Sequence, residues 1–282
     1  MKVCRTIEAL QKLRSAFKEE VAFIPTMGAL HKGHLSLLSQ AKNSGKKTIV
    51  SIFVNRSQFN QPEDFDKYPM TEKKDLALLE AYDPDIVFIP SEAEIYPDGF
   101  EKRVLAGKVA QMWEGADRPG HFDGVTTILA KLFNIVRPDE LWLGQKDAQQ
   151  VAVVADIIKN LNFSISLKTA PTVREEDGLA YSSRNIRLSE SDRKRAPEIF
   201  KGLQKVRAAF EAGERKSSTL EEILRHSFQE AGLPNPEYAA LVRSHDFSPV
   251  KEADESSLAI VAMYLGKVRL LDNIKMKDGY HE

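Results

Sequence analysis

The chain has little of what marks a secreted, membrane-spanning or nucleic-acid-binding protein. Its 282 residues include one cysteine, Cys4, so no internal disulfide can form. Lysine and arginine (40) nearly balance aspartate and glutamate (41), so the net charge of −1 gives no field that attracts nucleic acid or anionic lipid. The longest apolar runs, such as residues 49–54, are far too short to span a bilayer, and the first residues do not read as a signal peptide. We therefore expect a cytoplasmic protein without a membrane or nucleic-acid partner.

Two catalytic signatures are also missing. Gly28-x-x-x-x-Gly33 has the glycine spacing of a P-loop, but His34 and Leu35 follow where that motif needs Lys and then Ser or Thr. The sequence has no recognisable nucleophile elbow, and no cluster of cysteine and histidine has the spacing of a zinc site. These absences exclude a Walker-type lysine and leave the protein without an obvious covalent nucleophile.

Apolar strands alternate with amphipathic helices through the first 170 residues. The predicted strands are residues 21–24, 48–54, 86–90, 141–143 and 163–167, and the predicted helices are residues 6–17, 34–43, 72–82, 125–136 and 147–160. Continuously apolar strands separated by such helices are typical of a parallel sheet covered on both faces. The pattern predicts a doubly wound α/β domain over residues 1–175.

The pattern changes in the last third of the chain. Ser189 and Ser218 each precede an acidic residue by three positions, which predicts the N-cap of a helix at each serine. Strand-like runs follow at residues 238–242, 258–265 and 268–273, and Gly266-Lys267 suits a hairpin between the last two. We expect a second, smaller α+β domain over residues 176–282.

The segment Thr26–His34 joins the first predicted strand directly to a helix that begins at about His34 or Leu35. Such a turn directs backbone N–H groups and the positive end of the helix dipole at a ligand, usually a phosphate. His31 and His34 are three residues apart, so at a helix start they lie on one side, and Gly33 allows the backbone to approach a ligand. The alternative is a surface turn with two solvated histidines.

Two further polar loops are expected beside this turn. Ligands of doubly wound sheets bind beyond the carboxyl ends of the strands, where Asn55–Gln58 and Gly144–Asp147 also lie. We expect the three loops to form one cleft. A separate cluster, Tyr181–Asn185, lies near the domain junction, and its serine hydroxyls and the fork of Arg184 suit a phosphate chain. An ordinary polar interdomain loop is the alternative.

The His-x-Gly-His turn and the Ser/Arg loop together resemble the adenylate-forming nucleotidyltransferases related to class I aminoacyl-tRNA synthetases, whose second motif is KMSKS. Longer stretches are similar to the pantothenate synthetase (pantoate–β-alanine ligase) family, and these are residues 23–31, 118–125, 131–136, 171–175 and 177–180. The resemblance covers nearly the whole chain. It implies a Rossmann-like nucleotidyltransferase fold, with the smaller C-terminal domain acting as a lid that keeps water from an acyl adenylate.

The resemblance also implies a reaction and a set of site residues. ATP-dependent condensation of pantoate with β-alanine would pass through pantoyl adenylate and release pyrophosphate and AMP. The implied ATP contacts are Met27, Gly28, Ala29, Leu30, His31, Lys32, Gly33, His34, Gly144, Gln145, Lys146, Asp147, Val173, Tyr181, Ser182, Ser183 and Arg184. The implied catalytic residues are His31, His34, Lys146 and Arg184, with His34 donating a proton to the departing pyrophosphate. Gln58, Gln150 and Asn55 are implied for binding of pantoate and β-alanine.

Mg²⁺ is expected to accompany ATP, held mainly by phosphates and water, with Asp75 as a candidate ligand. The family implies a homodimer. Four positions depart from the family pattern: Arg56 stands in place of proline, Gln145 of glutamate, Ala148 of tyrosine and Tyr181 of methionine. None of the four departures removes an implied phosphate ligand.

Two other functions stay open. One is a transferase that moves AMP to a phosphorylated substrate, although the neutral amides of Gln58 and Gln150 suit a hydroxy acid better than a phosphate, which calls for Arg or Lys. The other is a nucleotide-binding module without catalysis. Retention of His34, Lys146 and Arg184 speaks against that module, whereas Arg56 in the altered loop speaks for it.

Overall fold

The computed structural model describes residues 1–60, 65–66 and 68–277, and the chain divides into two compact units. Unit 1 comprises Met1–Gln145 and Val153–Pro171, and unit 2 comprises Lys146–Ala152 together with the chain from Thr172 onward. The domain boundary expected after residue 175 stays a prediction.

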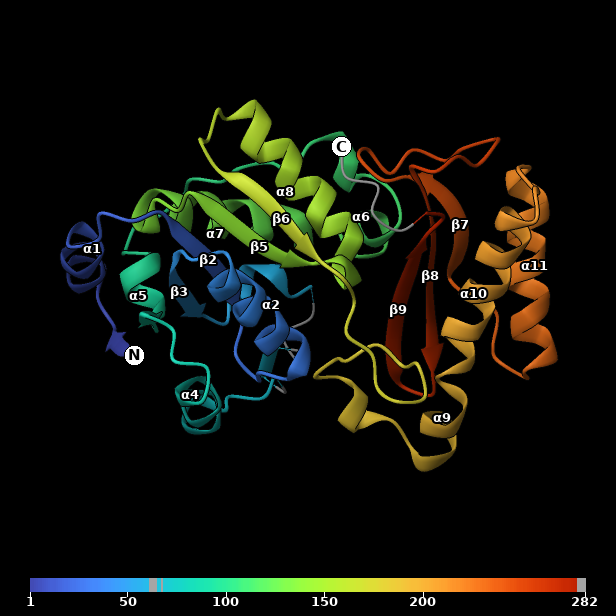
Figure 1. Ribbon diagram of the computed structural model, residues 1–282, viewed down its shortest axis with the longest axis horizontal. Helices are drawn as coiled ribbons and strands as arrows, with labels where there is room; N and C mark the ends of the chain where they lie inside the picture. Colours follow the sequence, from blue (N-terminus) through green and yellow to red (C-terminus); the bar gives the residue numbers. More distant parts are fainter. Residues whose placement is uncertain (61–64, 67, 278–282) are drawn as a thin grey trace. The chain divides into compact units, whose positions relative to one another are not determined.

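Unit 1 contains a six-stranded sheet in which every neighbouring pair is parallel (Figure 1). The strand order is β1-β4-β3-β2-β5-β6. The strands are β1 (Lys2–Cys4), β2 (Val21–Thr26), β3 (Lys47–Ile52), β4 (Ile86–Phe88), β5 (Glu140–Gly144) and β6 (Ser166–Ala170). The predicted doubly wound parallel sheet is confirmed.

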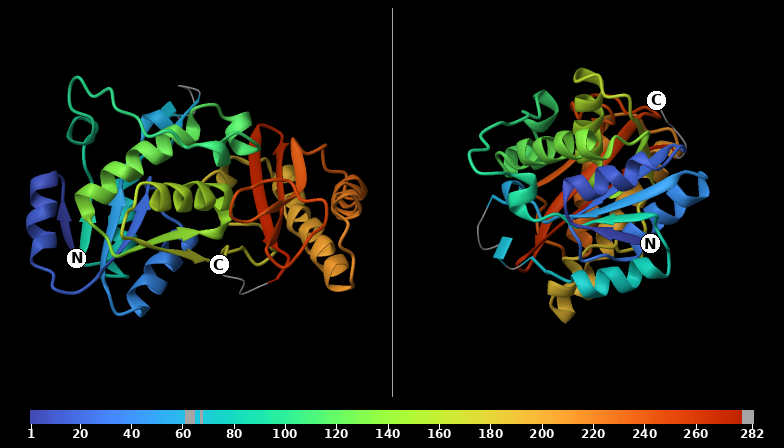
Figure 2. Two further views of the ribbon diagram at one scale, coloured as in Figure 1. Left: turned by 90° about the horizontal axis from the view of Figure 1, so that it is seen from above. Right: turned by 90° about the vertical axis from the view of Figure 1, so that its left-hand side faces the viewer.

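Helices cover both faces of this sheet. They are α1 (Ile7–Ser15), α2 (Lys32–Asn43), α4 (Glu72–Glu80), α5 (Glu92–Ile95), α6 (Glu114–Asp117), α7 (His121–Val136) and α8 (Ala148–Asn160), with short 3-10 helices η1 (Arg56–Gln58), η2 (Lys108–Ala110) and η3 (Gln145–Asp147). Helix α2 packs on one face, and α7 and α8 lie on the other (Figure 2). In the part of the chain that the structure describes, no helix combines the length and apolar character needed to cross a membrane.

Strand β2 shows why the parallel sheet could be predicted. Four successive side chains, Val21, Ala22, Phe23 and Ile24, are at most 1% exposed. Successive side chains of a strand point to opposite faces, so burial of all four requires cover on both faces. A continuous apolar run is the sequence pattern that this arrangement produces.

Two predicted boundaries in unit 1 need correction, and one strand was missed. Strand β6 begins at Ser166 rather than at residue 163, because Phe163 packs its ring edge-on against Phe133, with the centroids 5.2 Å apart. Helix α7 begins at His121 rather than at residue 125. Strand β1 was not predicted, because three residues at a sheet edge carry too little pattern to recognise.

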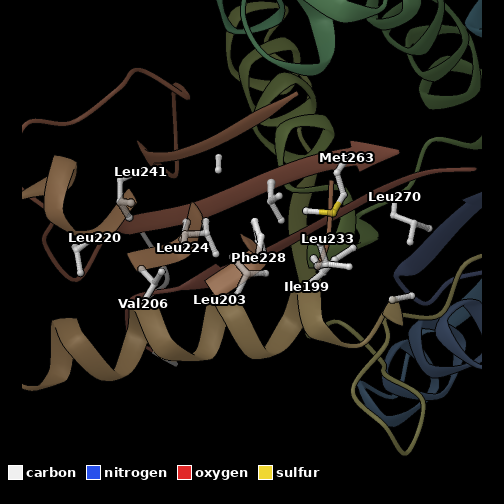
Figure 3. Close-up of a cluster of buried hydrophobic side chains, with 14 of the residues drawn as sticks. Ile199, Leu203, Val206, Leu220, Leu224, Phe228, Leu233, Leu241, Met263 and Leu270 are labelled. Atoms are coloured by element: carbon white, nitrogen blue, oxygen red, sulfur yellow. The ribbon is translucent and has the colours of Figure 1, made fainter. Parts of the chain in front are cut away.

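Unit 2 contains a three-stranded antiparallel sheet in the order β7-β8-β9. Its elements are η4 (Asn185–Arg187), α9 (Glu190–Arg195), α10 (Glu198–Glu211), α11 (Ser217–Glu230), β7 (Tyr238–Arg243), β8 (Ser257–Leu265) and β9 (Val268–Lys275). Helices α10 and α11 pack side by side, and their buried side chains form one core with those of the sheet (Figure 3). The predicted hairpin is confirmed, because Leu265 pairs with Val268 across Gly266-Lys267.

The two predicted helix caps of unit 2 differ in outcome. Ser189 caps α9, because its Oγ accepts from the backbone N–H of Asp192 at 3.1 Å. The cap at Ser218 was wrong, since α11 already begins at Ser217 after Lys216. Glu221, the acid that suggested this cap, instead accepts from the N–H of Leu241 at 3.0 Å and so ties α11 to β7.

Close packing of α10 against α11 depends on Gly202. A Cβ atom at this position would lie 2.6 Å from a ring carbon of Phe228, which is itself fully buried. We expect Gly202→Ala to lower the free energy of unfolding by about 1 to 3 kcal/mol, because overpacking outweighs the better helix propensity of alanine. Urea denaturation measures the change. Gln204→Ala on the exposed side of α10 is the control, and equal midpoints for the two variants would contradict the packing argument.

Candidate functional site

Strand β2 marks the place where the winding of the sheet reverses. It pairs with β3 on one side and with β5 on the other. The segments that leave β2, β3 and β5 therefore start from one edge of the sheet, which is where ligands of such sheets bind. The turn after Thr26 and the residues Gly144 and Gln145 begin at this switch point. The shared edge of the three loops is confirmed for unit 1, and the single cleft stays a prediction.

The two histidines of the turn after β2 belong to the start of helix α2, whereas residues 27–30 precede the helix. Helix α2 begins at Lys32, earlier than predicted, because His31 is its N-cap and its Nδ1 accepts from the N–H of Gly33 at 3.2 Å. This bond places the ring proton of neutral His31 on Nε2, where it can be donated. The His31 and His34 rings lie with centroids 4.1 Å apart, so the predicted common side is confirmed. Both imidazoles thus lie at the positive end of the α2 dipole.

A buried carboxylate shapes the turn that precedes His31. Gly28 and Ala29 both have left-handed backbone, with φ of 78° and 49°. Asp75 on α4 is 2% exposed and accepts from the N–H groups of Ala29 at 3.0 Å and Leu30 at 2.8 Å. The Thr71 hydroxyl donates to the same carboxylate at 3.0 Å. Asp75 therefore holds the backbone in its unusual conformation.

Asp75 does not fit the magnesium role that the sequence suggested. Both of its oxygens already accept hydrogen bonds, and the site is closed to solvent. Across residues 1–60, 65–66 and 68–277, no group of three or more His, Cys, Asp or Glu is placed to hold a metal ion. The described residues thus do not supply a protein-only Mg²⁺ site.

Helix α7 holds the turn after β3. Asn55 is fully buried, and its Nδ2 donates to the carbonyl of Gly124 at 3.0 Å. Its Oδ1 accepts from the hydroxyls of Ser57 at 2.9 Å and Tyr96 at 3.0 Å. Burial raises the pKa of Tyr96, so this hydroxyl keeps its proton and donates. These contacts make Asn55 part of the framework of the turn, and a direct contact with substrate stays a prediction.

His121 and Gly124, at the start of α7, contact the backbone of the turn after β3. His121 Nδ1 lies 2.7 Å from the carbonyl oxygen of Gln58 and donates to it. A Cβ on Gly124 would lie 2.4 Å from the carbonyl oxygen of Ser57, so only glycine allows the helix to approach this turn so closely. The glycines and the histidine of residues 120–124 suggest a close approach of backbone, but the sequence pattern does not indicate the partner, which lies more than 60 residues earlier.

Unit 2 gathers a second group of predicted site residues. Lys146, Ser182 and Arg184 line one cavity of about 20 Å³ together with Asn185 and Asp272. The two predicted cationic residues and a hydroxyl residue, together with Arg269, thus line a space that holds about one water. The structure brings together the predicted lysine and the predicted Ser/Arg loop, which are separated by more than 30 residues in the sequence.

Four other residues singled out from the sequence do not line this cavity. Val173 accepts from the N–H of Tyr181 at 3.0 Å, which closes the base of the Ser/Arg loop. Gln58 is buried in unit 1, whereas Gln150 is half-buried on the unit 2 part of α8, so their pairing stays a prediction. The Arg56 guanidinium lies 5.2 Å from the ring centroid of Phe65, which gives this departure from the family pattern an aromatic partner.

A doubly wound sheet with paired histidines at a helix start beyond its switch point defines a nucleotide-binding α/β enzyme. Comparison with known proteins identifies it further. A family model described as pantoate-beta-alanine ligase matches residues 2–275. The chain belongs to this family, and the predicted ligase class is confirmed.

Several pantothenate synthetases are similar to this chain along nearly the whole length of both sequences. The pantothenate synthetase of Chloroherpeton thalassium is 42% identical over 98% of this chain and 100% of the relative, and that of Hydrogenovibrio crunogenus is 45% identical over 95% of both. The crystal structure of pantothenate synthetase from Thermus thermophilus has a TM-score of 0.92 and 37% identity, covering 98% of this chain and all of the other. That of Francisella tularensis pantoate-beta-alanine ligase, a complex with beta-gamma ATP and beta-alanine, has a TM-score of 0.82 and 34% identity over 99% of both chains.

Replacing Asp75 tests its part in the turn. We expect Asp75→Asn to lower the free energy of unfolding by about 1 to 3 kcal/mol, because the amide that replaces one oxygen turns a donor towards backbone N–H groups and leaves one of them unsatisfied. Thermal and urea denaturation measure the loss. Glu80→Gln, at an exposed position of α4, is the control. If Asp75→Asn unfolds at the same midpoint as the control, the carboxylate does not hold the turn.

Proposed function

We propose that this chain uses ATP to join pantoate to β-alanine through a pantoyl adenylate, with release of pyrophosphate and AMP. The observation that carries the proposal is family membership over nearly the whole chain, with the histidine turn intact at the switch point of the sheet. The Francisella relative, crystallised with beta-gamma ATP and beta-alanine, supports the choice of two of the substrates. The neutral amides of Gln58 and Gln150 support a hydroxy acid rather than a phosphorylated substrate.

In the first step, a carboxylate oxygen of pantoate attacks the α-phosphorus of ATP. A new P–O bond forms, the bond to the bridging oxygen of the β-phosphate breaks, and pyrophosphate leaves. We assign His31 and His34 to the phosphates at the positive end of α2, with His34 giving a proton to pyrophosphate. Lys146 and Arg184 offset the charge on the leaving group. No enzyme nucleophile is needed for this step.

In the second step, the amine of β-alanine attacks the acyl carbon of the adenylate. An amide bond forms, the bond between the acyl carbon and the phosphate oxygen breaks, the amine nitrogen releases a proton to water, and AMP leaves. The protein contributes positioning and charge stabilisation in both steps. Gln58 and Gln150 are assigned to pantoate, and Asn55 shapes the turn that carries Gln58.

The remaining ATP contacts are assigned by the resemblance. They are Met27, Gly28, Ala29, Leu30, Lys32, Gly33, Gly144, Gln145, Asp147, Val173, Tyr181, Ser182 and Ser183. Mg²⁺ is proposed to arrive with the triphosphate, held by phosphate oxygens and water.

The proposal also includes a division into a domain of residues 1–175 and a lid of residues 176–282, a homodimer and a cytoplasmic location. Size-exclusion chromatography with light scattering tests the dimer.

Pyrophosphate release is the measurement that tests the proposed activity. With ATP, Mg²⁺ and pantoate alone, we expect one equivalent of pyrophosphate per site, because the adenylate accumulates without its acceptor. Addition of β-alanine should convert this burst into steady formation of AMP and pantothenate. ATP binding without pyrophosphate release would favour a non-catalytic nucleotide module. Release that requires a phosphorylated acceptor in place of pantoate would favour the nucleotidyltransferase alternative.

Arg184 offers a test of the charge argument. We expect Arg184→Ala to slow pyrophosphate release in a single turnover by about 100- to 1,000-fold, the loss typical of one preorganised donor. Arg187→Ala, at an exposed position of η4, is the control and should retain the wild-type rate. An unchanged rate in Arg184→Ala would remove the Tyr181–Arg184 loop from the chemistry of the first step.

A further inference from the structure

Two consecutive residues of β9, Asp272 and Asn273, are linked to the two cationic segments that the proposed function assigns to the phosphates. Asn273 bonds to Lys146 directly, and Asp272 bonds to Arg174, which precedes the Tyr181–Arg184 loop. We propose that this pair positions Lys146 and the Tyr181–Arg184 loop relative to one another, so that the two cations meet the triphosphate in a preset geometry. The inference rests on the proposed function, and it assigns a role to the C-terminal strand. Both residues are positioning residues, since they act through the segments they hold.

Asp272 holds the loop through Arg174. Its Oδ2 accepts from Arg174 Nη1 at 2.5 Å and its Oδ1 accepts from Nη2 at 2.9 Å, which makes a two-point contact. The side chains of Arg174 and Asp272 are 15% and 6% exposed. The guanidinium also lies 3.5 Å from the ring centroid of Phe200. The Arg174 guanidinium is thus held at its edge by the Asp272 carboxylate and on its face by the Phe200 ring, so it has little freedom to move.

Arg174 stands at the base of the hairpin that leads into the loop. It pairs with Ala180 as an isolated antiparallel bridge, and Tyr181 donates its N–H to the carbonyl of Val173 at 3.0 Å. At the other end of the loop, Asn185 Nδ2 donates to the Ala180 carbonyl at 3.0 Å. Both ends of the Tyr181–Arg184 segment are therefore tied to the residue pair 174 and 180, and through Arg174 to β9.

Asn273 holds the other segment. Its Nδ2 donates to the backbone carbonyl of Lys146 at 3.0 Å, and its own N–H donates to Asp272 Oδ1 at 2.8 Å. Neighbouring side chains of a strand point to opposite faces, so adjacent residues can reach two different segments. Both Asp272 and Asn273 are buried. The backbone of β9 thus becomes the common support of Lys146 and the loop.

The small cavity lined by Lys146, Ser182, Arg184 and Asp272 shows where these supports converge. A bare carboxylate at this place would repel a triphosphate. The bidentate pair with Arg174 offsets that charge, so Lys146 and Arg184 line the cavity, together with Arg269, beside a carboxylate that is already paired. Groups fixed before the reaction need no reorganisation in the transition state, which is why a displacement of about 1 Å can cost about 100-fold in rate.

The test compares Asp272→Asn and Asn273→Ala with a matched break elsewhere in unit 2. Glu221→Ala removes the 3.0 Å bond that its carboxylate accepts from the N–H of Leu241, a tie between α11 and β7 whose two residues do not line the cavity. Far-UV circular dichroism at the assay temperature establishes that each variant is folded. We expect single-turnover pyrophosphate release to fall by about 100-fold in the two β9 variants, and to stay at the wild-type rate in Glu221→Ala.

Two further measurements distinguish failure of the inference from misfolding of a variant and from failure of the proposed function. If Asp272→Asn does not fold, Arg174→Lys keeps the positive charge but loses the two-point contact, and it is expected to show the same slow release. Equal rates in the β9 variants and in Glu221→Ala would overturn the inference. If the wild type releases no pyrophosphate, the proposed function fails, and equilibrium dialysis with ATP alone then decides the inference. Weaker ATP binding in the β9 variants than in the wild type and Glu221→Ala would support it, and equal binding would overturn it.

Discussion

The pairing of β2 with β3 on one side and with β5 on the other is the constraint on which the candidate site depends. Because these strands are parallel, their carboxyl ends share one edge, and the segments that leave them all start there. The segment after β2 becomes a helix after five intervening residues, so the positive end of α2 is directed at this edge. The burial of β2 on both faces makes it a central strand of the sheet.

Buried polar side chains then shape each turn at the site. Asp75 organises the turn before His31, Asn55 organises the turn that carries Gln58, and Asp272 and Asn273 support the cationic segments of unit 2. Each makes several hydrogen bonds to its surroundings, as buried polar groups must, because an unsatisfied one is costly. Their partners are backbone groups and side chains of the surrounding segments, so these residues set the path of the chain at the site.

This division of labour suits a ligase of the pantoate-beta-alanine ligase family. A reaction that needs no enzyme nucleophile depends on the placement of charges and donors around a triphosphate. In the proposed mechanism these charges are assigned to the imidazoles at the start of α2 and to Lys146 and Arg184 of unit 2, and buried carboxylates and amides hold the segments that carry them. Arg56, which the resemblance places at a position of proline, has its guanidinium 5.2 Å from the ring centroid of Phe65.

The sequence by itself determined the fold class, the β8–β9 hairpin and the common side of His31 and His34, because each follows from a local period or a short spacing. Local signals also failed where a distant partner intervened: Glu221 suggested a cap at Ser218 but bonds to β7, and Phe163 suggested a strand but packs on α7. Only the tertiary structure decided that Asp75 holds the turn before His31, 45 residues away, and that Asp272 pairs with Arg174, 98 residues away. No period or spacing encodes such contacts, because the chain segments that meet are chosen by the packing of the whole sheet and not by their neighbours in sequence.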